Sequence, residues 1–278
     1  MAGDARAVSR DLSIGVFDSG IGGLTVLRAL MQRLPRERFL YLGDTARLPY
    51  GTKTAATVER YALQAVEELT GRGVKALVVA CNTACAAALP ALQAAHPAIP
   101  VIGVIEPGAA AAVAATATGR IAVLATEGTV RGGAYQREIL KRMPEARVIA
   151  IPATLFVALA EEGWTDGEVA VATARRYLAP LFAAVAEAPD VLVLGCTHFP
   201  PLIAAIRQIV GEGVAIVDSA RTTATALEQL LDARQLGRQE GSGAADFLVT
   251  DGEERFGRVG PVFLGRDIAP ATIERVDL

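Results

Sequence analysis

Two segments of this chain repeat one pattern, and this pattern constrains the fold more than any other feature. The first runs Val-Lys-Ala-Leu-Val-Val-Ala-Cys over residues 74–81, and the second runs Val-Leu-Val-Leu-Gly-Cys over residues 191–196. Apolar, valine-rich runs of this kind are typical of parallel strands that are buried on both faces. Open α/β sheets bind ligands just past the carboxyl ends of such strands. We therefore expect Cys81 and Cys196 at the ligand-binding edges of two similar sheets.

The rest of the chain supports an α/β fold, because strand-like and helix-like runs alternate along most of it. Amphipathic periodicity predicts helices such as 23–34 and 54–69 between the strands. The strand-like runs lie at 14–17, 39–42, 77–80, 101–105, 121–124, 148–151, 191–194 and 215–217. This alternation predicts βαβ units and mostly parallel sheets.

The pattern also indicates a repeat of two similar α/β domains. Residues 14–19 resemble residues 121–126 in character, just as the two cysteine segments resemble each other. A late strand at 246–251 follows a loop-like segment and is expected to return to the first unit. We place the first domain at residues 1–104 plus 218–278 and the second at residues 105–217.

Composition excludes several classes of protein. The 278 residues carry a net charge of −3, so neither a nucleic-acid partner nor an acidic membrane partner is expected. The three cysteines are few and odd in number, which favours a reducing cytoplasm over a secreted disulfide framework. Residues 1–12 lack the apolar core of a signal peptide, and prolines and polar residues interrupt every long apolar run. No membrane association is expected.

Two turn motifs follow early strands. The first, Asp-Ser-Gly-Ile-Gly-Gly at 18–23, lacks the residues of a P-loop and the spacing of a dinucleotide fingerprint. It is either a tight turn or a place where Asp18 and Ser19 face a ligand, with Asp18 holding an ammonium group or orienting a thiol. The second, Asp-Thr-Ala-Arg-Leu-Pro-Tyr-Gly at 44–51, is either a structural turn or a loop whose N–H groups bind an anion.

The two cysteines carry the chemistry. A lone buried thiol is most often an inert apolar group, but here two thiols each stand beside hydrogen-bonding residues and before a predicted helix. A helix N-terminus lowers the pKa of a thiol and binds carboxylates. Two facing bases suit a reaction in which a carbon loses a proton on one face and regains it on the other, which is racemisation. His198 could exchange a proton with Cys196 or with a substrate amine.

The remaining candidates point to no metal or redox centre. Cys85 follows Cys81 at a spacing that fits neither a zinc site nor a thioredoxin motif, so it is interpreted as packing. His96 precedes a proline and is interpreted as a helix cap. None of the three lysines stands in a strand-end motif, so a pyridoxal phosphate Schiff base is not expected. No cofactor and no metal are predicted.

Taken together, the motifs resemble those of the cofactor-independent glutamate racemases of the aspartate/glutamate racemase superfamily. The matching pieces are residues 18–23, 43–51, 81–84 and 195–200, with supporting matches at 125–130, 161–164 and 249–251. They occur in one order over nearly the whole chain. The resemblance implies two α/β domains with the active site in the cleft between them, and interconversion of L- and D-glutamate to supply D-glutamate for peptidoglycan.

The resemblance also implies residue roles. The thiol of Cys81 would deprotonate D-glutamate with help from Asp18, and Cys196 would deprotonate L-glutamate with help from His198 and, behind it, Glu161. The substrate-binding residues would be Ser19, Asn82, Thr83 and Thr197 for the α-carboxylate, the backbone of Pro49, Tyr50 and Gly51 for the side-chain carboxylate, and Thr126 and Thr129 on the second domain's side.

One departure from the family pattern leaves a choice open. The family usually shows a Cys-Pro pair before the apolar run that leads to the glutamate, where this chain has Ile151 and Pro152. Either Glu161 or Glu162 could therefore support His198.

Three rival functions remain open from the sequence. The nearest is an aspartate or other small-acid racemase of the same superfamily, with substrate length set around residues 49–51. A non-catalytic amino-acid-binding protein would clamp its ligand between two domains without needing the thiols. A thiol oxidoreductase is disfavoured, because no Cys-x-x-Cys is present. A homodimer is a further possibility.

Overall fold

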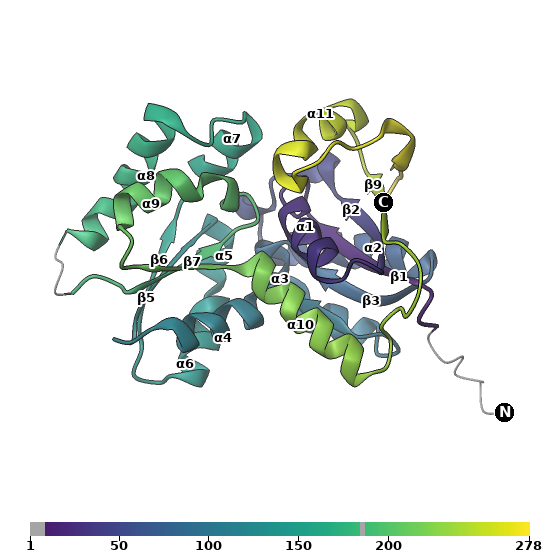
Figure 1. The fold of residues 1–278 in the computed structure, drawn as a ribbon, viewed down its shortest axis with the longest axis horizontal. Helices are drawn as coiled ribbons and strands as arrows, with labels where there is room; N and C mark the ends of the chain where they lie inside the picture. The colour runs from purple at the N-terminus through teal and green to yellow at the C-terminus, as the bar shows by residue number, and fades with distance from the viewer. Residues whose placement is uncertain (1–8, 184–186) are drawn as a thin grey trace.

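The chain forms two α/β units, each built on its own parallel sheet, in a computed structural model that describes residues 9–183 and 187–278 (Figure 1). All neighbouring strands within the two sheets pair in parallel. Parallel pairs need crossover connections, usually helices, between their members. The predicted fold class, two similar α/β domains with mostly parallel sheets, is confirmed.

The first sheet has the strand order β10-β9-β2-β1-β3-β4. Its strands are β1 (Ser13–Asp18), β2 (Arg38–Gly43), β3 (Val74–Val79), β4 (Val101–Gly103), β9 (Ala244–Val249) and β10 (Ile273–Arg275). The helices associated with it are α1 (Leu24–Arg33), α2 (Ala55–Gly71), α3 (Asn82–Ala95), α10 (Ser219–Ala233) and α11 (Glu253–Leu264), with short 3-10 helices η1 (Thr45–Arg47), η2 (Tyr50–Thr52) and η4 (Pro270–Thr272). As predicted, the late strand returns to this sheet, where β9 pairs with β2.

The second sheet has the strand order β6-β5-β7-β8. Its strands are β5 (Arg120–Ala125), β6 (Arg147–Pro152), β7 (Val191–Gly195) and β8 (Ala215–Asp218). Its helices are α4 (Ile105–Ala115), α5 (Glu127–Gly132), α6 (Ala134–Arg142), α7 (Leu155–Glu161), α8 (Gly167–Phe182) and α9 (Ile203–Val210), with the short 3-10 helix η3 (Pro200–Leu202). Figure 1 shows α8 and α9 on one face of this sheet and α4 and α6 on the other.

The strand order of the second unit repeats that of the first. The order β2-β1-β3-β4 corresponds to β6-β5-β7-β8, so β3 and β7 occupy equivalent places. Both strands are buried along their whole length, which explains their mainly apolar sequences; the charged residue in β3, Lys75, is buried and pairs with Glu37. The two cysteine segments are therefore topological equivalents, as the repeated sequence pattern indicates.

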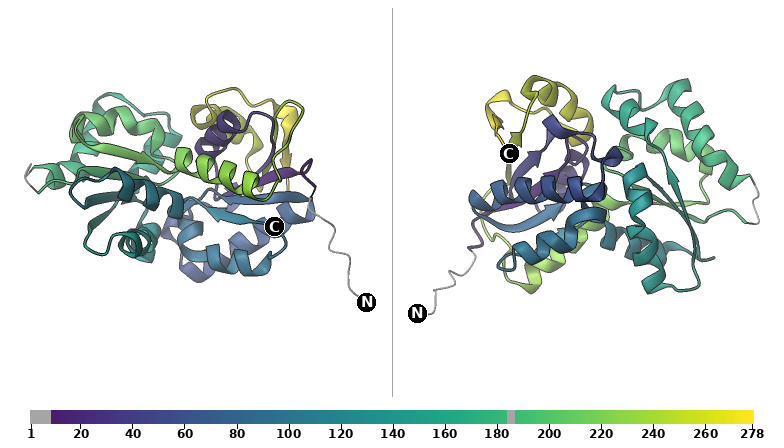
Figure 2. Two further views of the ribbon diagram at one scale, coloured as in Figure 1. Left: turned by 60° about the horizontal axis from the view of Figure 1, so that its bottom comes forward. Right: turned by 180° about the vertical axis from the view of Figure 1, so that it is seen from behind.

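Helix α10 runs along the junction of the two units (Figures 1 and 2). It packs against α1 of the first unit and also contacts α4 of the second. Strand membership assigns residues 13–103 and 244–275 to one sheet and residues 120–218 to the other. The predicted domain limits at 104/105 and 217/218 stay a prediction. Helix α10 contacts both units, so it does not mark where the second unit ends and the first resumes.

The strand predicted at 101–105 is too long at its carboxyl end. Strand β4 ends at Gly103, and α4 begins at Ile105. A glutamate in the first turn of a helix interacts favourably with the helix dipole, and proline is tolerated there because its missing N–H would have no intrahelical partner. Glu106 and Pro107 therefore belong to the start of a helix rather than to a loop after a strand.

The prediction that both cysteines open a helix is wrong for Cys196. A turn follows Cys196, in which the backbone N–H of Phe199 donates to the Cys196 carbonyl at 3.2 Å, and α9 begins only at Ile203. Two consecutive prolines, Pro200 and Pro201, supply no N–H groups, so a helix through them would lack two hydrogen bonds. The chain makes a short 3-10 helix there instead.

Apolar side chains from both units join in one connected core. It contains the central strands and the inner faces of the helices that cover them. Among the residues that the structure describes, no helix combines the length and apolar character needed to cross a bilayer.

Candidate active site

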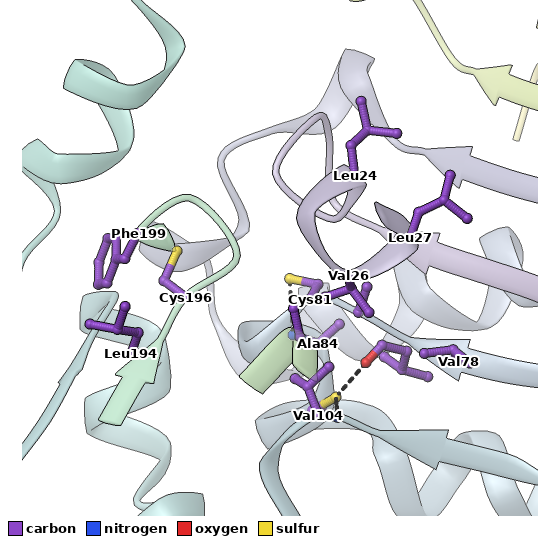
Figure 3. Packing of buried hydrophobic residues seen from close by; sticks show 14 of the residues in the cluster. Leu24, Val26, Leu27, Val78, Cys81, Ala84, Val104, Leu194, Cys196 and Phe199 are labelled. Atoms are coloured by element: carbon purple, nitrogen blue, oxygen red, sulfur yellow. Dashed lines mark hydrogen bonds between the residues drawn. The ribbon is translucent and has the colours of Figure 1, made fainter. Parts of the chain in front are cut away.

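A cavity of about 270 Å³ lies where the carboxyl ends of strands from both sheets come together. Strands β1 and β3 lead into Ser19 and Cys81, while β5 and β7 lead into Thr126 and Cys196. Figure 3 shows the side chains of Cys81 and Cys196. The lining residues are Ser19, Gly20, Leu48, Pro49, Tyr50, Gly51, Thr52, Cys81, Asn82, Thr83, Thr126, Thr154, Val157, Ala158, Glu161, Cys196, Thr197 and His198. Drug-sized ligands occupy sites of roughly 300–1,000 Å³, so this cavity suits a small metabolite.

Nearly every predicted site residue lines this cavity. The exceptions are Asp18 and Thr129, which lie directly behind it. Asp18 accepts a hydrogen bond from the N–H of Gly20, and Thr129 contacts the hydroxyls of Thr83 and Thr126. The structure thus brings the whole predicted set together, whereas the individual roles assigned to these residues remain predictions.

Cys81 lies at the N-terminus of α3, where it is the N-cap residue. Its Sγ accepts a hydrogen bond from the N–H of Ala84 at 3.4 Å and lies 3.4 Å from the Ser19 hydroxyl oxygen, to which the thiol can donate. Burial, reinforced by the charge of Asp18, raises the pKa of Cys81 to about 12. At neutral pH this sulfur is therefore a protonated thiol, able to give a proton.

Asp18 is fully buried at the end of β1. Its Oδ2 accepts from the N–H of Gly20 at 2.9 Å, while its Oδ1 has no hydrogen-bond partner among the described residues. Burial raises the pKa of Asp18, and the charge of His198 opposes this only in part. A buried carboxylate oxygen without a partner is costly unless a ligand supplies a donor such as an ammonium group.

Cys196 has a different neighbour, the imidazole of His198. The distance between Cys196 Sγ and His198 Nδ1 is 3.9 Å. Burial by itself would lower the pKa of His198, but its hydrogen bonds to Cys196 and Glu161 raise that pKa to about 10. His198 is therefore an imidazolium at neutral pH, able to supply a proton to the sulfur or to balance its charge.

The imidazolium is held by a chain of charged groups that spans the two units. His198 Nε2 lies 3.1 Å from Glu161 Oε1, and Arg255 Nη2 lies 3.0 Å from Glu161 Oε2. Burial would raise the pKa of Glu161, but the hydrogen bond and charge of His198, with Arg255 in addition, hold it below its ordinary value. Glu162 is exposed, so the contact with His198 is made by Glu161.

The segment that carries Cys196 is also supported by the N-terminal region of the first unit. The Thr25 hydroxyl donates to the Thr197 carbonyl at 2.9 Å. A Cβ atom on Gly22 would lie only 2.3 Å from His198 Nδ1, so glycine is needed for the two units to approach this closely. The ring of Phe263 packs edge-on against His198, with centroids 5.3 Å apart. Four side chains or backbone positions of the first unit, counting Arg255, therefore position the segment of the second unit that carries Cys196 and His198.

Three threonines join the units on the other side of the cavity. The Thr83 hydroxyl lies 2.9 Å from that of Thr126 and 3.2 Å from that of Thr129. Thr126 is the N-cap residue of α5 and accepts a hydrogen bond from the N–H of Thr129. A cluster of hydroxyls at two helix N-termini provides donors for a carboxylate.

The loop with Pro49, Tyr50 and Gly51 is fixed from behind by Asp44. This buried carboxylate accepts hydrogen bonds from the Tyr50 hydroxyl, from Arg47 Nε at 2.7 Å and from Thr250 Oγ1 at 2.9 Å. The Tyr50 ring thus lines the cavity while its hydroxyl points away from it. These bonds use side chains, and the Tyr50 carbonyl accepts from the Lys53 N–H at 3.0 Å, so the N–H groups are the backbone atoms of the loop that suit an anionic ligand.

Sequence reasoning missed six lining residues, and three of them, Thr154, Val157 and Ala158, lie on or next to α7 beside the predicted Glu161; the others are Gly20, Leu48 and Thr52. Thr154, Val157, Ala158 and Glu161 face the cavity together. Their spacing of three and four residues is that of one helix face, so the placement of Glu161 could have identified the others. Leu48 and Thr52 flank the predicted 49–51 loop.

Two further sequence interpretations concern Cys85 and His96. Cys85 is buried away from the cavity, where its thiol donates to the Val79 carbonyl at 3.0 Å, so it packs as predicted. His96 is the C-cap residue of α3. Within residues 9–183 and 187–278, no three His, Cys, Asp or Glu side chains gather closely enough to hold a metal ion.

The fold and the site together define a class of enzyme in which each of two equivalent α/β units contributes a thiol to one small cavity. A family model described as Asp/Glu/Hydantoin racemase matches residues 14–227. The glutamate racemase of Geobacter metallireducens is 51% identical over 254 residues, which cover 91% of this chain and 93% of that protein.

Solved structures agree with this match. Glutamate racemase from Francisella tularensis in complex with D-glutamate superposes with a TM-score of 0.89 at 36% identity, covering 96% of this chain and 98% of that one. Glutamate racemase from Thermus thermophilus in complex with β-chloro-D-alanine gives 0.86 at 43% identity, covering 97% and 98%. The chain belongs to the Asp/Glu/Hydantoin racemase family, among relatives that are glutamate racemases.

Proposed function

We propose that this protein interconverts L- and D-glutamate by moving the α-proton between two thiols. The observation that carries the proposal is the presence of Cys81 and Cys196 in one cavity, each from the equivalent strand end of a different unit. Full-length relatives named glutamate racemase support glutamate as the substrate.

In this mechanism each thiol serves one face of the α-carbon. Cys196, as thiolate beside the His198 imidazolium, removes the proton from L-glutamate, while the Cys81 thiol delivers a proton to the opposite face. Cys81 removes the proton from D-glutamate in the reverse direction. The hydrogen bond to Ser19 and the nearby Asp18 would assist Cys81, and His198 backed by Glu161 would assist Cys196.

The polar groups around the cavity suit the three charged groups of glutamate. Asn82, Thr83, Thr197 and Ser19 would bind the α-carboxylate, and Asn82 Nδ2 is buried without a partner among the described residues. The unpartnered Asp18 Oδ1 is one group able to attract the ammonium. The backbone of residues 49–51 would bind the side-chain carboxylate, with Thr126 and Thr129 completing the second unit's wall.

An α-proton is weakly acidic, so the developing carbanion must be stabilised without an electron sink. Fixed donors on the α-carboxylate lower the energy of the enolate-like transition state, and a cavity that excludes water strengthens them. The residues on hand supply these effects through helix N-termini and buried amides and hydroxyls.

The proposal includes a cellular setting. A reducing compartment, the cytoplasm, is supported by three cysteines that are all free thiols. The D-glutamate product would supply peptidoglycan synthesis. A homodimer is proposed as well, on the ground that the second unit exposes large apolar side chains, among them Ile149, Leu155 and Trp164. Light scattering of the purified protein tests this last point.

Exchange of the α-hydrogen tests the reaction itself. Purified protein is incubated with L-glutamate in D₂O without added cofactor, and circular dichroism and α-deuterium content are followed together. We expect the optical signal to decay to zero while deuterium enters the α-position. Faster racemisation of aspartate than of glutamate would instead identify a different small-acid racemase. Binding of glutamate without deuterium incorporation would indicate a non-catalytic amino-acid-binding protein.

A further inference from the structure

Tyr135 connects the second unit to the substrate-binding wall of the first. It is fully buried near the start of α6, and its hydroxyl lies 2.9 Å from Oδ1 of Asn82, the first residue of α3. Tyr135 does not line the cavity, and no sequence motif singles it out. Its only polar side-chain atom reaches across the junction to a residue that does line the cavity.

Asn82 is the receiving side of this contact. Its side chain is buried and lines the cavity, and its Nδ2 has no hydrogen-bond partner among the residues that the structure describes. A buried amide donor is costly to leave unpaired, so the atom is expected to meet an acceptor on the ligand. A carboxylate is the acceptor that glutamate brings.

The Tyr135 hydroxyl decides which end of the amide faces the ligand. Burial raises the pKa of Tyr135 far above its ordinary value, so the phenol keeps the proton that it donates to Asn82 Oδ1 in the structure. Donation to Oδ1 leaves the NH₂ end of Asn82 turned toward the cavity. The opposite orientation would place the amide oxygen against a carboxylate and repel it.

Two glycines make room for the Tyr135 ring, which packs closely against them. A Cβ atom on Gly195 would lie 2.9 Å from Tyr135 Cε2, and one on Gly108 would lie 3.2 Å from the Tyr135 hydroxyl oxygen. Gly195 ends β7 directly before Cys196, and Gly108 lies in α4. The ring therefore fills a slot that extends from the second thiol segment to the Asn82 amide.

We propose that Tyr135 is a positioning residue that fixes the Asn82 amide with its donor end toward the α-carboxylate of the substrate. This inference rests on the proposed racemase function. Tyr135 belongs to the second unit and Asn82 to the first. The carboxylate-binding site is therefore complete only when the two units pack against each other.

The first test removes the hydroxyl alone. Tyr135→Phe keeps the ring in its slot, and we expect kcat/KM for both glutamate enantiomers to fall roughly three- to tenfold, mainly through KM, as for loss of one neutral hydrogen bond. Tyr177→Phe is the matched control, because its hydroxyl accepts from the N–H of Leu155 at 3.3 Å and reaches no side chain of the cavity. The control should keep wild-type KM.

A double-mutant cycle tests whether Tyr135 acts through Asn82. In an Asn82→Ala background the hydroxyl has no amide to orient, so Tyr135→Phe should change KM less than twofold. Equal KM effects of Tyr135→Phe with and without Asn82 would overturn the inference. Wild-type protein that neither racemises glutamate nor exchanges its α-proton would overturn the proposed function first, so the two failures are distinguishable.

A third variant guards against a folding defect in Tyr135→Phe. Gly108→Ala favours helix α4, since alanine has a higher helix propensity than glycine, yet its methyl group crowds the Tyr135 hydroxyl. We expect a KM raised severalfold, because the phenol must shift away from the added methyl group, and loss of this KM effect in the Asn82→Ala background at whatever melting temperature the variant has. A purely structural role of Tyr135 predicts that KM follows stability, which would contradict the inference.

Discussion

The two thiols occupy equivalent positions of a repeated fold but have opposite electrostatic surroundings. Cys81 follows β3 and caps a helix beside the carboxylate of Asp18. Cys196 follows the equivalent strand β7, enters a turn instead of a helix, and lies beside the imidazole of His198. The repeated strand order therefore accounts for where the sulfurs are, whereas the segments after the strands determine their charge environment.

This difference suits a reaction that needs an acid and a base at the same moment. Burial beside Asp18 raises the pKa of Cys81 to about 12, so that sulfur retains its proton at neutral pH. His198, with a pKa raised to about 10, provides a positive charge on the opposite side of the cavity. This contrast agrees with the proposed mechanism, in which Cys196 takes a proton from L-glutamate and Cys81 gives one. After one turnover in that direction Cys196 carries a proton and Cys81 has lost one, so both sulfurs must regain their starting protonation states.

The largest expected effect comes from deleting either sulfur. Each enantiomer needs a base on one face and an acid on the other, so Cys81→Ala and Cys196→Ala should each stop racemisation in both directions. Positioned acid–base groups contribute on the order of 10²–10⁴ in rate, and each variant should lose at least that much kcat/KM. Polarimetry from each pure enantiomer measures it.

Half-reactions separate the two faces. With a glutamate analogue that carries a β-leaving group, abstraction leads to elimination without reprotonation. Cys81→Ala should still eliminate from the L analogue, and Cys196→Ala from the D analogue. Cys85→Ala is the control and should stay active with only a modest loss of stability. A racemase with an active Cys81→Ala variant and an inactive Cys85→Ala variant would contradict the two-thiol mechanism.

Replacing His198 should have the next largest effect. His198→Asn removes the positive charge while keeping a polar side chain, and hydrogen bonds to charged groups are worth about 1.5–3 kcal/mol. We expect kcat/KM to fall about 10- to 100-fold. The wild-type rate should also decline as the pH rises through about 10, where the imidazolium loses its proton. If His198→Asn shows the same decline in rate near this pH, the decline belongs to the titration of another group.

Asp18→Asn should lower the catalytic efficiency that depends on Cys81 but raise the stability of the folded protein. Because burial raises the pKa of Asp18, the folded state disfavours its ionised form, and the neutral amide avoids this cost. We expect about tenfold lower kcat/KM, within the range for one charged hydrogen bond, and about 1 kcal/mol more stability near pH 7. Urea denaturation measures the second effect. Lower stability in Asp18→Asn would mean that the buried carboxylate has a donor, such as a bound water, that offsets its burial.

Stability should also depend on pH through His198, with a sign opposite to that of an ordinary salt-bridged carboxylate. The folded-state pKa of about 10 exceeds the ordinary 6.5, so the native state binds this proton more tightly. The resulting stabilisation is complete below pH 6.5 and is lost as the pH rises toward about 10. The free energy of unfolding should therefore fall more over this range in wild type than in His198→Asn. Parallel curves would show that His198 is not protonated in the native state.

Much of this site could be predicted from sequence, because it is made of strand ends. A buried parallel strand has an unmistakable apolar run, and the residue after it must lie at the ligand edge, so Cys81, Cys196 and Ser19 are identifiable. The short strand β10, of three residues, carries no such run and is not predicted. The 3-10 helix after Cys196 is not predicted either. The strand-end pattern indicates a helix that starts at the cysteine, but Pro200 and Pro201 delay the start of α9 to Ile203.

Contacts between the units were not predictable in the same way. Tyr135 lies 53 residues from Asn82 and Arg255 lies 94 residues from Glu161. Nothing local distinguishes either residue, because a buried tyrosine and a half-exposed arginine on a helix are both ordinary. Their significance arises only from docking the units, which sequence periodicity does not describe.

The smallest expected effect tests the outermost member of the charged chain. Arg255 lies on α11 of the first unit and pairs with Glu161, but its side chain is 42% exposed. Exposed ion pairs contribute about 0–1 kcal/mol and are screened by salt. Arg255→Met should therefore lower kcat/KM only about two- to threefold at low ionic strength, and the difference from wild type should shrink at roughly 0.5–1 M salt.

Arg258→Met is the matched control, since Arg258 is exposed on the same helix and has no ion pair among the described residues. If both variants lose activity equally, the effect comes from the overall charge of α11. If only Arg255→Met loses activity and the loss is salt-dependent, Arg255 supports the Cys196 half of the site through Glu161, and the electrostatic contrast between the two thiols extends across the junction of the units.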